Sequence, residues 1–168
     1  MRARRRFLTL ALAAGLASVA GVGGVAGAAE VGDVVTLPAV QLLDGRMVPP
    51  SHWAGKPLVI EVWASWCPFC ALQNPRLQAL YDSTRKGGHP LQVLTISIDK
   101  EPKVAADYLK QRGYTFPATM DSPDLRKALG ARKGLPELYV LDARGRVVQK
   151  ELGEMLDEDV AALARYAK

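Results

Sequence analysis

Short apolar runs alternate with amphipathic stretches along the chain from Val34 onward, as in a domain built from both strands and helices. Residues 57–63 (PLVIEVW) are apolar almost throughout, which is typical of a strand buried on both faces. An earlier pair of apolar runs within residues 35–48 is interrupted by Asp44-Gly45 and predicts a hairpin with a glycine turn. The remaining predicted strands are residues 91–98, 137–141 and 147–152.

Helices are predicted where apolar residues recur every three or four positions. After Cys67 the apolar positions Leu72, Leu77, Leu80 and Tyr81 have this spacing, and Gly87-Gly88 ends the pattern. The predicted helices are residues 67–85, 104–111, 121–129 and 157–167. The order is βαβ, then helices, then ββα, with no internal repeat, so the fold class is α/β.

Residues 1–28 are predicted to be an export signal, and residues 29–168 the folded domain. The signal has a basic start, an apolar stretch over residues 7–25 and a small-residue cleavage site at residues 26–28 (AGA). Residues 4–8 (RRRFL) resemble the twin-arginine export motif, with general secretion as the alternative. An uncleaved membrane anchor is a further alternative, because about 20 residues can span a bilayer. Each route places the domain in the periplasm or another extracytoplasmic compartment, where disulfides persist.

Length and charge narrow the function classes. The 168 residues, 49% hydrophobic and 23% charged, suffice for one domain with its own core. The formal net charge is +5, but four arginines lie in the export signal. Without them, 18 basic residues stand against 17 acidic ones, a net charge of +1. We therefore expect no nucleic-acid partner. No oligomerisation pattern is present either, so we expect a monomer.

The only two cysteines, Cys67 and Cys70, lie where a predicted strand gives way to a predicted helix. The free amides and the positive dipole end of a helix N-terminus favour a thiolate, which would make Cys67 a nucleophile. Cys70 lies three residues further along the same helix face, where it can attack a mixed disulfide formed by Cys67. The spacing therefore predicts thiol–disulfide exchange.

Two alternatives remain for this pair. A structural disulfide would close a very small loop and stabilise little, because its effect grows with loop length. A zinc site would need two more ligands, and the only histidines, His52 and His89, are not at finger-like spacing. A CxxC pair at a strand-to-helix junction of an exported chain favours redox chemistry over both.

Residues 61–70 (EVWASWCPFC), Pro75 and residues 134–148 (GLPELYVLDARGRVV) resemble the thioredoxin-like superfamily, in particular its exported TlpA/ResA/CcmG-type thiol-disulfide oxidoreductases. The resemblance covers residues 37–168. It implies a thioredoxin-like fold with a central mixed β-sheet flanked by helices and an N-terminal β-hairpin addition. It also implies no cofactor beyond a redox-active Cys67–Cys70 disulfide, and no metal.

The resemblance further implies roles for individual residues. Cys67 attacks and Cys70 resolves, as their positions also predict. Trp66 matches the tryptophan that precedes the pair, and Pro136 matches the family's cis-proline, whose preceding residue pairs with an extended substrate strand. We therefore expect Trp66, Leu135 and Pro136 to bind substrate. An ordinary trans proline at the start of a strand is the alternative.

Glu61 lies six residues before Cys67 in an otherwise apolar run, and it matches the position where thioredoxins carry a buried acid beneath the resolving cysteine. A buried carboxyl has a raised pKa, so it can take a proton from Cys70 near neutral pH. The alternative is a solvent-facing acid on an edge strand. Many TlpA/ResA/CcmG-type members carry Asn here and Glu where this chain has Gln73-Asn74, so we expect a different arrangement of acids.

The predicted function is that of an exported protein-disulfide reductase. The resemblance implies protein disulfides or dithiols as substrates, for example those of apocytochrome c, and a membrane-embedded thiol as electron donor. Residues 134–137 (GLPE) match the Gly-x-Pro-Glu of cytochrome c maturation members. The alternatives are the same chemistry run as an oxidant, which only the relative stability of the two redox forms separates, and a carrier of a metal such as copper with the cysteines as soft ligands.

Overall fold

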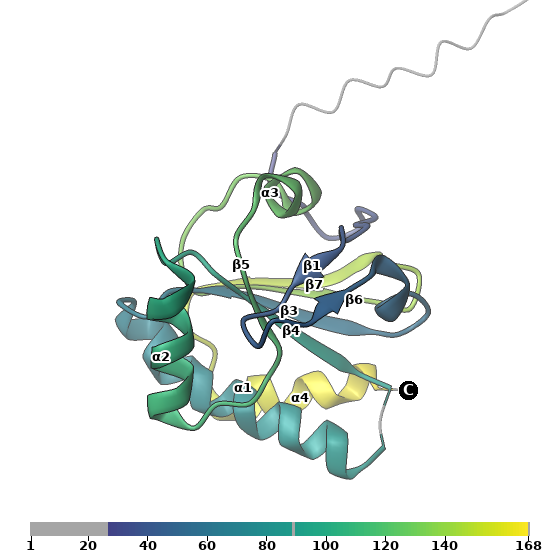
Figure 1. Cartoon of the computed structure of the whole chain (residues 1–168). Helices are drawn as coiled ribbons and strands as arrows, with labels where there is room; N and C mark the ends of the chain where they lie inside the picture. The colour runs from purple at the N-terminus through teal and green to yellow at the C-terminus, as the bar shows by residue number, and fades with distance from the viewer. Residues whose placement is uncertain (1–26, 89, 168) are drawn as a thin grey trace, which may run out of the picture.

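A five-stranded mixed sheet forms the centre of the computed structural model, which describes residues 27–88 and 90–167 (Figure 1). The strand order is β5-β4-β3-β6-β7, in which β3, β4 and β5 are parallel and β6 and β7 run antiparallel to their neighbours. The strands are β3 (Leu58–Trp63), β4 (Gln92–Ser97), β5 (Ala118–Met120), β6 (Glu137–Leu141) and β7 (Val147–Leu152). The predicted thioredoxin-like α/β fold with a central mixed sheet is confirmed.

Helices cover both faces of the sheet (Figure 1). The helices are α1 (Pro68–Lys86), α2 (Pro102–Arg112), α3 (Pro123–Leu129) and α4 (Asp157–Ala162), with short 3₁₀ turns η1 (Pro50–His52) and η2 (Leu163–Tyr166). One face packs against α1, α2 and α4, and the other against α3 and the N-terminal segment. A proline opens each of α1, α2 and α3, where its missing N–H costs no helical hydrogen bond.

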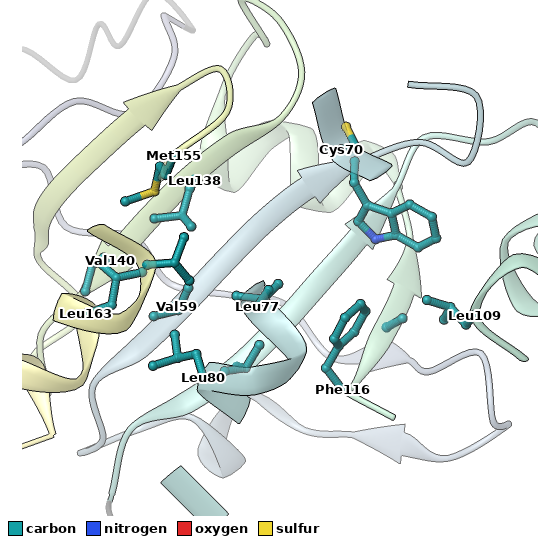
Figure 2. Close-up of a cluster of buried hydrophobic side chains, with 14 of the residues drawn as sticks. Val59, Cys70, Leu77, Leu80, Leu109, Phe116, Leu138, Val140, Met155 and Leu163 are labelled. Carbon is teal, nitrogen blue, oxygen red and sulfur yellow. The ribbon is translucent and has the colours of Figure 1, made fainter. Parts of the chain in front are cut away.

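The face beneath α1 holds the larger cluster of buried apolar side chains (Figure 2). Strands β3 and β6 contribute Val59, Leu138 and Val140, and α1 contributes Leu77 and Leu80. Their alternation along each strand follows from the two-residue period of a β-strand. The cluster extends to the second cysteine, so the N-terminal half of α1 is anchored directly on the sheet.

The predicted N-terminal hairpin is present but shorter than its apolar pattern. Strands β1 (Val40–Gln41) and β2 (Met47–Val48) pair antiparallel around a turn in which Gly45 has a φ of 89°. Leu42 instead forms a bridge with Thr119 of β5. The N-terminal segment therefore packs along the edge of the main sheet as well as on itself.

The structure differs from the sequence predictions at one strand and at the last helix. Strand β5 was not predicted, because its three residues are too few to show a period and its position depends on pairing with β4. The last helix was predicted to reach residue 167, but α4 ends at Ala162 and continues as the 3₁₀ turn η2. Such tightening is common at the C-terminal end of a helix.

Residues 1–26 of the predicted export signal lie outside the described residues. Within residues 27–88 and 90–167, no helix combines the length and the apolar character needed to cross a membrane.

Candidate active site

The two cysteines lie at the N-terminal end of α1, as their spacing predicted. Cys67 is the N-cap residue, and its Sγ accepts a hydrogen bond from the backbone N–H of Cys70 at 3.3 Å. Both are free thiols, and Cys67 is 5% exposed whereas Cys70 is 0% exposed. Burial and the neighbouring Cys67 thiol raise the pKa of Cys70. Both thiols are thus buried, the small remaining exposure belongs to Cys67, and Cys70 needs a base to ionise.

Glu61 lies on the central strand β3 and is 0% exposed. The edge-strand alternative is therefore wrong. Its side chain shares the α1 face of the sheet, since Val59 and Trp63, two residues to either side, both belong to that core cluster. Burial raises the pKa of Glu61 to about 7, and a hydrogen bond from Gln73 offsets part of this increase. The carboxyl lies close enough for its charge to contribute to the raised pKa of Cys70.

Gln73 is the hydrogen-bond partner of Glu61, a contact that the sequence did not predict. Its Nε2 donates to Glu61 Oε2 at 3.0 Å, and its Oε1 accepts from the backbone N–H of Met155 at 2.7 Å. Gln73 is fully buried on α1. The spacing in the sequence could have indicated Gln73, because this residue lies three positions after Cys70 and therefore on the same helix face.

Trp66 is 66% exposed beside the cysteines, and Phe69 between them is also exposed. Trp63, three residues earlier on β3, is fully buried. Trp66 is therefore an apolar surface residue, whereas Trp63 packs in the core beneath α1.

The Leu135–Pro136 peptide bond is cis, so the trans alternative is wrong. Strand β6 begins only at Glu137, opposite Val62 near the end of β3, which places Pro136 at the edge of the sheet where α1 starts. Pro136 is buried, and its carbonyl accepts the backbone N–H of Gly153 at 2.8 Å. Leu135 is half-buried and precedes the strand.

Asp99 supports the loop before Cys67 and was also missed. Its carboxylate accepts the backbone N–H of Ser65 at 3.1 Å, the Ser65 hydroxyl at 2.8 Å and the Ser97 hydroxyl at 2.7 Å. Strands β3 and β4 are parallel, so the residues that follow them meet at one edge of the sheet. An acid directly after the predicted strand 91–98 was the signal available in the sequence.

The remaining polar candidates lie elsewhere. His52 is exposed in η1, and His89 lies outside the described residues. In the described part of the chain, no group of three or more His, Cys, Asp or Glu side chains gathers as a metal site would require. Glu137 of the GLPE segment is buried on the sheet face opposite the cysteines, because its neighbour Leu138 faces the α1 side.

Residues 30–166 match the Redoxin protein family. Thiol-disulfide oxidoreductase ResA of Geobacillus thermodenitrificans is 30% identical over 120 residues, which cover 70% of this chain and 67% of the relative. ResA of Bacillus cereus is 24% identical over 154 residues, which cover 91% of this chain and 87% of the relative.

Solved structures share the fold. A thioredoxin-family thiol:disulfide interchange protein from Chlorobium tepidum superimposes with a TM-score of 0.68 at 23% identity, covering 80% of this chain and 98% of that one. StoA from Bacillus subtilis superimposes with a TM-score of 0.65 at 22% identity, covering 79% and 99%. The family match spans most of the chain, and its relatives carry the activity that a CxxC pair predicts. The chain therefore belongs to the Redoxin family and is a thioredoxin-like thiol-disulfide oxidoreductase of the TlpA/ResA/CcmG type.

Proposed function

We propose that this protein reduces disulfide bonds in other exported proteins through the Cys67–Cys70 pair. The observation that carries the proposal is the difference in position and burial between the two thiols. Cys67 is at the surface end of the helix, whereas Cys70 is buried on the same sheet face as Glu61, whose pKa of about 7 suits it to proton transfer.

The proposed cycle begins when the Cys67 thiolate attacks a substrate disulfide, forming a mixed disulfide and releasing one substrate sulfur as a thiolate. Glu61 then takes the proton of Cys70, and the Cys70 thiolate attacks the Cys67 sulfur. The second substrate sulfur leaves as a thiolate and is protonated from solvent. Two electrons have passed to the substrate, and Cys67 and Cys70 are joined as a disulfide.

The cycle needs a partner on each side. An extended substrate segment would lie along Leu135 and Pro136, with Trp66 offering apolar contact area. A membrane-embedded thiol donor would return two electrons to the Cys67–Cys70 disulfide. Apocytochrome c is the substrate we propose, and residues 1–28 would export the protein to the compartment where both partners are found.

The direction of the reaction is tested by the reduction potential of the Cys67–Cys70 pair. Equilibration against a thiol redox buffer, followed by tryptophan fluorescence, should give a value near or below about −270 mV, that of thioredoxin. A value near about −120 mV, that of the oxidant DsbA, would instead make the protein a donor of disulfides. Stoichiometric metal binding without redox cycling would favour the carrier alternative.

The order of the two thiols is tested by trapping. Cys70→Ser should hold substrates as mixed disulfides on Cys67 that a reductant releases, because no resolving thiol remains. The double variant Cys67→Ser/Cys70→Ser is the matched control and should hold none. If Cys67→Ser alone traps partners instead, the assigned roles are reversed.

A further inference from the structure

We propose that Gln73 is a positioning residue that holds the Glu61 carboxyl in one orientation beneath Cys70 and is itself held by the backbone of Met155. The proposal rests on the function proposed above, in which Glu61 takes the proton of Cys70. It adds to the active site a side chain of α1 and the loop that precedes α4.

The Met155 contact determines which way the Gln73 amide points. A backbone N–H can only donate, so the Gln73 atom that faces Met155 N at 2.7 Å must be the carbonyl oxygen. The amide nitrogen then points at Glu61 Oε2, at 3.0 Å. Turning the amide over would place N–H against N–H and oxygen against carboxylate. Gln73 is thus a donor to Glu61 in every conformation that keeps both contacts.

The loop that holds Gln73 is itself fixed on α1. The Arg76 Nη1 donates to the Met155 carbonyl at 2.7 Å and pairs with Glu154 at 2.6 Å, and Arg76 also pairs with Asp157. The N–H and the carbonyl of Met155 are therefore both bound by side chains from one turn of α1. This double attachment prevents the amide of Gln73 from swinging away from Glu61.

One oxygen of Glu61 is left for proton transfer. Oε2 is occupied by Gln73, and Oε1 has no hydrogen-bond partner among the groups that the structure describes. The flanking strands place Thr95 and Leu138 beside Glu61, and neither side chain titrates.

The other titratable groups of this cluster are two cysteines and four tyrosines: Cys67, Cys70 and Tyr81 of α1, Tyr108 of α2, Tyr114 after it and Tyr166 of η2. Tyr108 packs on Trp63 with ring centroids 5.3 Å apart. Within the described residues none of these groups is hydrogen-bonded to Glu61. The α4 side also contributes the apolar Met155 and Val160. Gln73 is therefore the polar contact through which the neutral or ionised state of Glu61 is biased. Its N–H favours the carboxylate, and this is why it lowers a pKa that burial raises.

Replacing Gln73 by Met, which has similar length but no donor, tests the proposal. The ¹³C NMR shift of the Glu61 side-chain carboxyl, followed against pH, should show a midpoint about one unit higher than in the wild type. At pH 7 the ionised fraction would then fall about fivefold, and so would the rate at which Cys70 resolves a mixed disulfide. The rate should recover near pH 9, and attack by Cys67 should not change.

Gln78→Met is the matched control. Gln78 lies on the same helix and likewise accepts a backbone N–H, that of Thr115 at 2.7 Å, but it does not contact Glu61. This variant should lose a comparable tertiary contact and keep the Glu61 midpoint. An equal shift in both variants would assign the effect to general loosening of α1 and overturn the proposal.

Gln73→Glu provides a second variant that keeps the acceptor for Met155. Two carboxyls would then share the site, so the Glu61 midpoint should again move upward, because like charges disfavour ionisation. A wild-type midpoint in both Gln73 variants would refute the positioning role. Because the NMR titration observes the carboxyl itself, it decides this proposal even if the protein shows no exchange activity.

Discussion

Two glutamates on neighbouring strands, Glu61 on β3 and Glu137 on β6, are both 0% exposed, yet the protein surrounds them differently. They lie almost side by side, since Glu61 is paired with Leu138 and Glu137 with Val62, but they project from opposite faces of the sheet. Glu61 contacts the neutral amide of Gln73. Glu137 faces the Lys150 ammonium at 3.6 Å.

The difference shows that the partner decides what a buried acid can do. A neutral donor leaves Glu61 with a pKa raised to about 7, so the group can gain and lose a proton near neutral pH. Glu137 has a cation beside it instead. Burial and the nearby charge of Glu137 raise the pKa of Tyr139. The α1 face thus carries an acid suited to proton transfer, and the opposite face carries a structural ion pair.

The largest expected effect comes from removing the cation. Lys150→Met would leave Glu137 buried without this counter-charge and would also remove the Lys150 contacts to the Ala29 carbonyl and to Glu30, and we expect a loss of about 4 kcal/mol in the free energy of unfolding. Urea denaturation at pH 7 measures it. The exposed Lys127→Met is the control, with an expected change within about 0.5 kcal/mol. Equal losses in the two variants would show that Glu137 does not depend on Lys150.

The second effect is a pH dependence of stability that belongs to Glu61. Its pKa rises from 4.5 to about 7 on folding, so between these values the folded protein keeps a proton that the unfolded chain releases. The associated stability is fully present below about pH 4.5 and is lost as the pH rises to about 7, a total of about 3 kcal/mol.

Glu61→Gln lacks this titration. Relative to the wild type, the variant should gain about 3 kcal/mol of unfolding free energy between pH 4.5 and pH 8. Urea denaturation of both proteins across this range measures the difference and cancels the contributions of other carboxyls. Parallel stability curves would mean that Glu61 titrates at its ordinary pKa despite its burial.

The third effect is kinetic. Glu61→Gln should slow the resolution of a mixed disulfide by Cys70 about 100-fold at pH 7, because general-base help of this kind contributes about that much. Attack by Cys67 should be nearly unchanged. Rapid-quench measurement of a mixed disulfide with a model peptide separates the two steps. Equal slowing of both would show that the acid is structural.

The smallest effect is expected from Glu137→Gln. Because this side chain faces away from the cysteines, resolution and attack should each change by less than about twofold. The same rapid-quench measurement applies. Slowing comparable to that of Glu61→Gln would mean that the two faces of the sheet are coupled. It would contradict the different roles assigned to Glu61 and Glu137.

Much of the fold was predictable because local patterns of apolar residues indicate its strands and helices. Residues 57–63 are apolar on both faces, and they form the fully buried central strand β3. The helix after Cys67 was predicted within a residue or two at each end. By contrast, β5 has only three residues, and its strand character depends on pairing with β4, which no local pattern contains.

The candidate site likewise has a part that local spacing predicts and a part that depends on distant contacts. The roles proposed for Cys67 and Cys70 come from positions three residues apart on one helix, and the burial of Glu61 from the apolar residues around it. Gln73 and Met155, in contrast, are 82 residues apart in the chain, and Asp99 lies 34 residues from Ser65. Such contacts exist only once distant segments have packed together.

The sequence by itself determined that a cysteine pair begins a helix directly after a buried strand that carries an acid. It determined this because spacing within one element dictates which side chains share a face. Only the tertiary structure decided that Glu61 meets an amide and Glu137 a cation. Those partners come from other elements, and the topology of the sheet determines which elements cover each face.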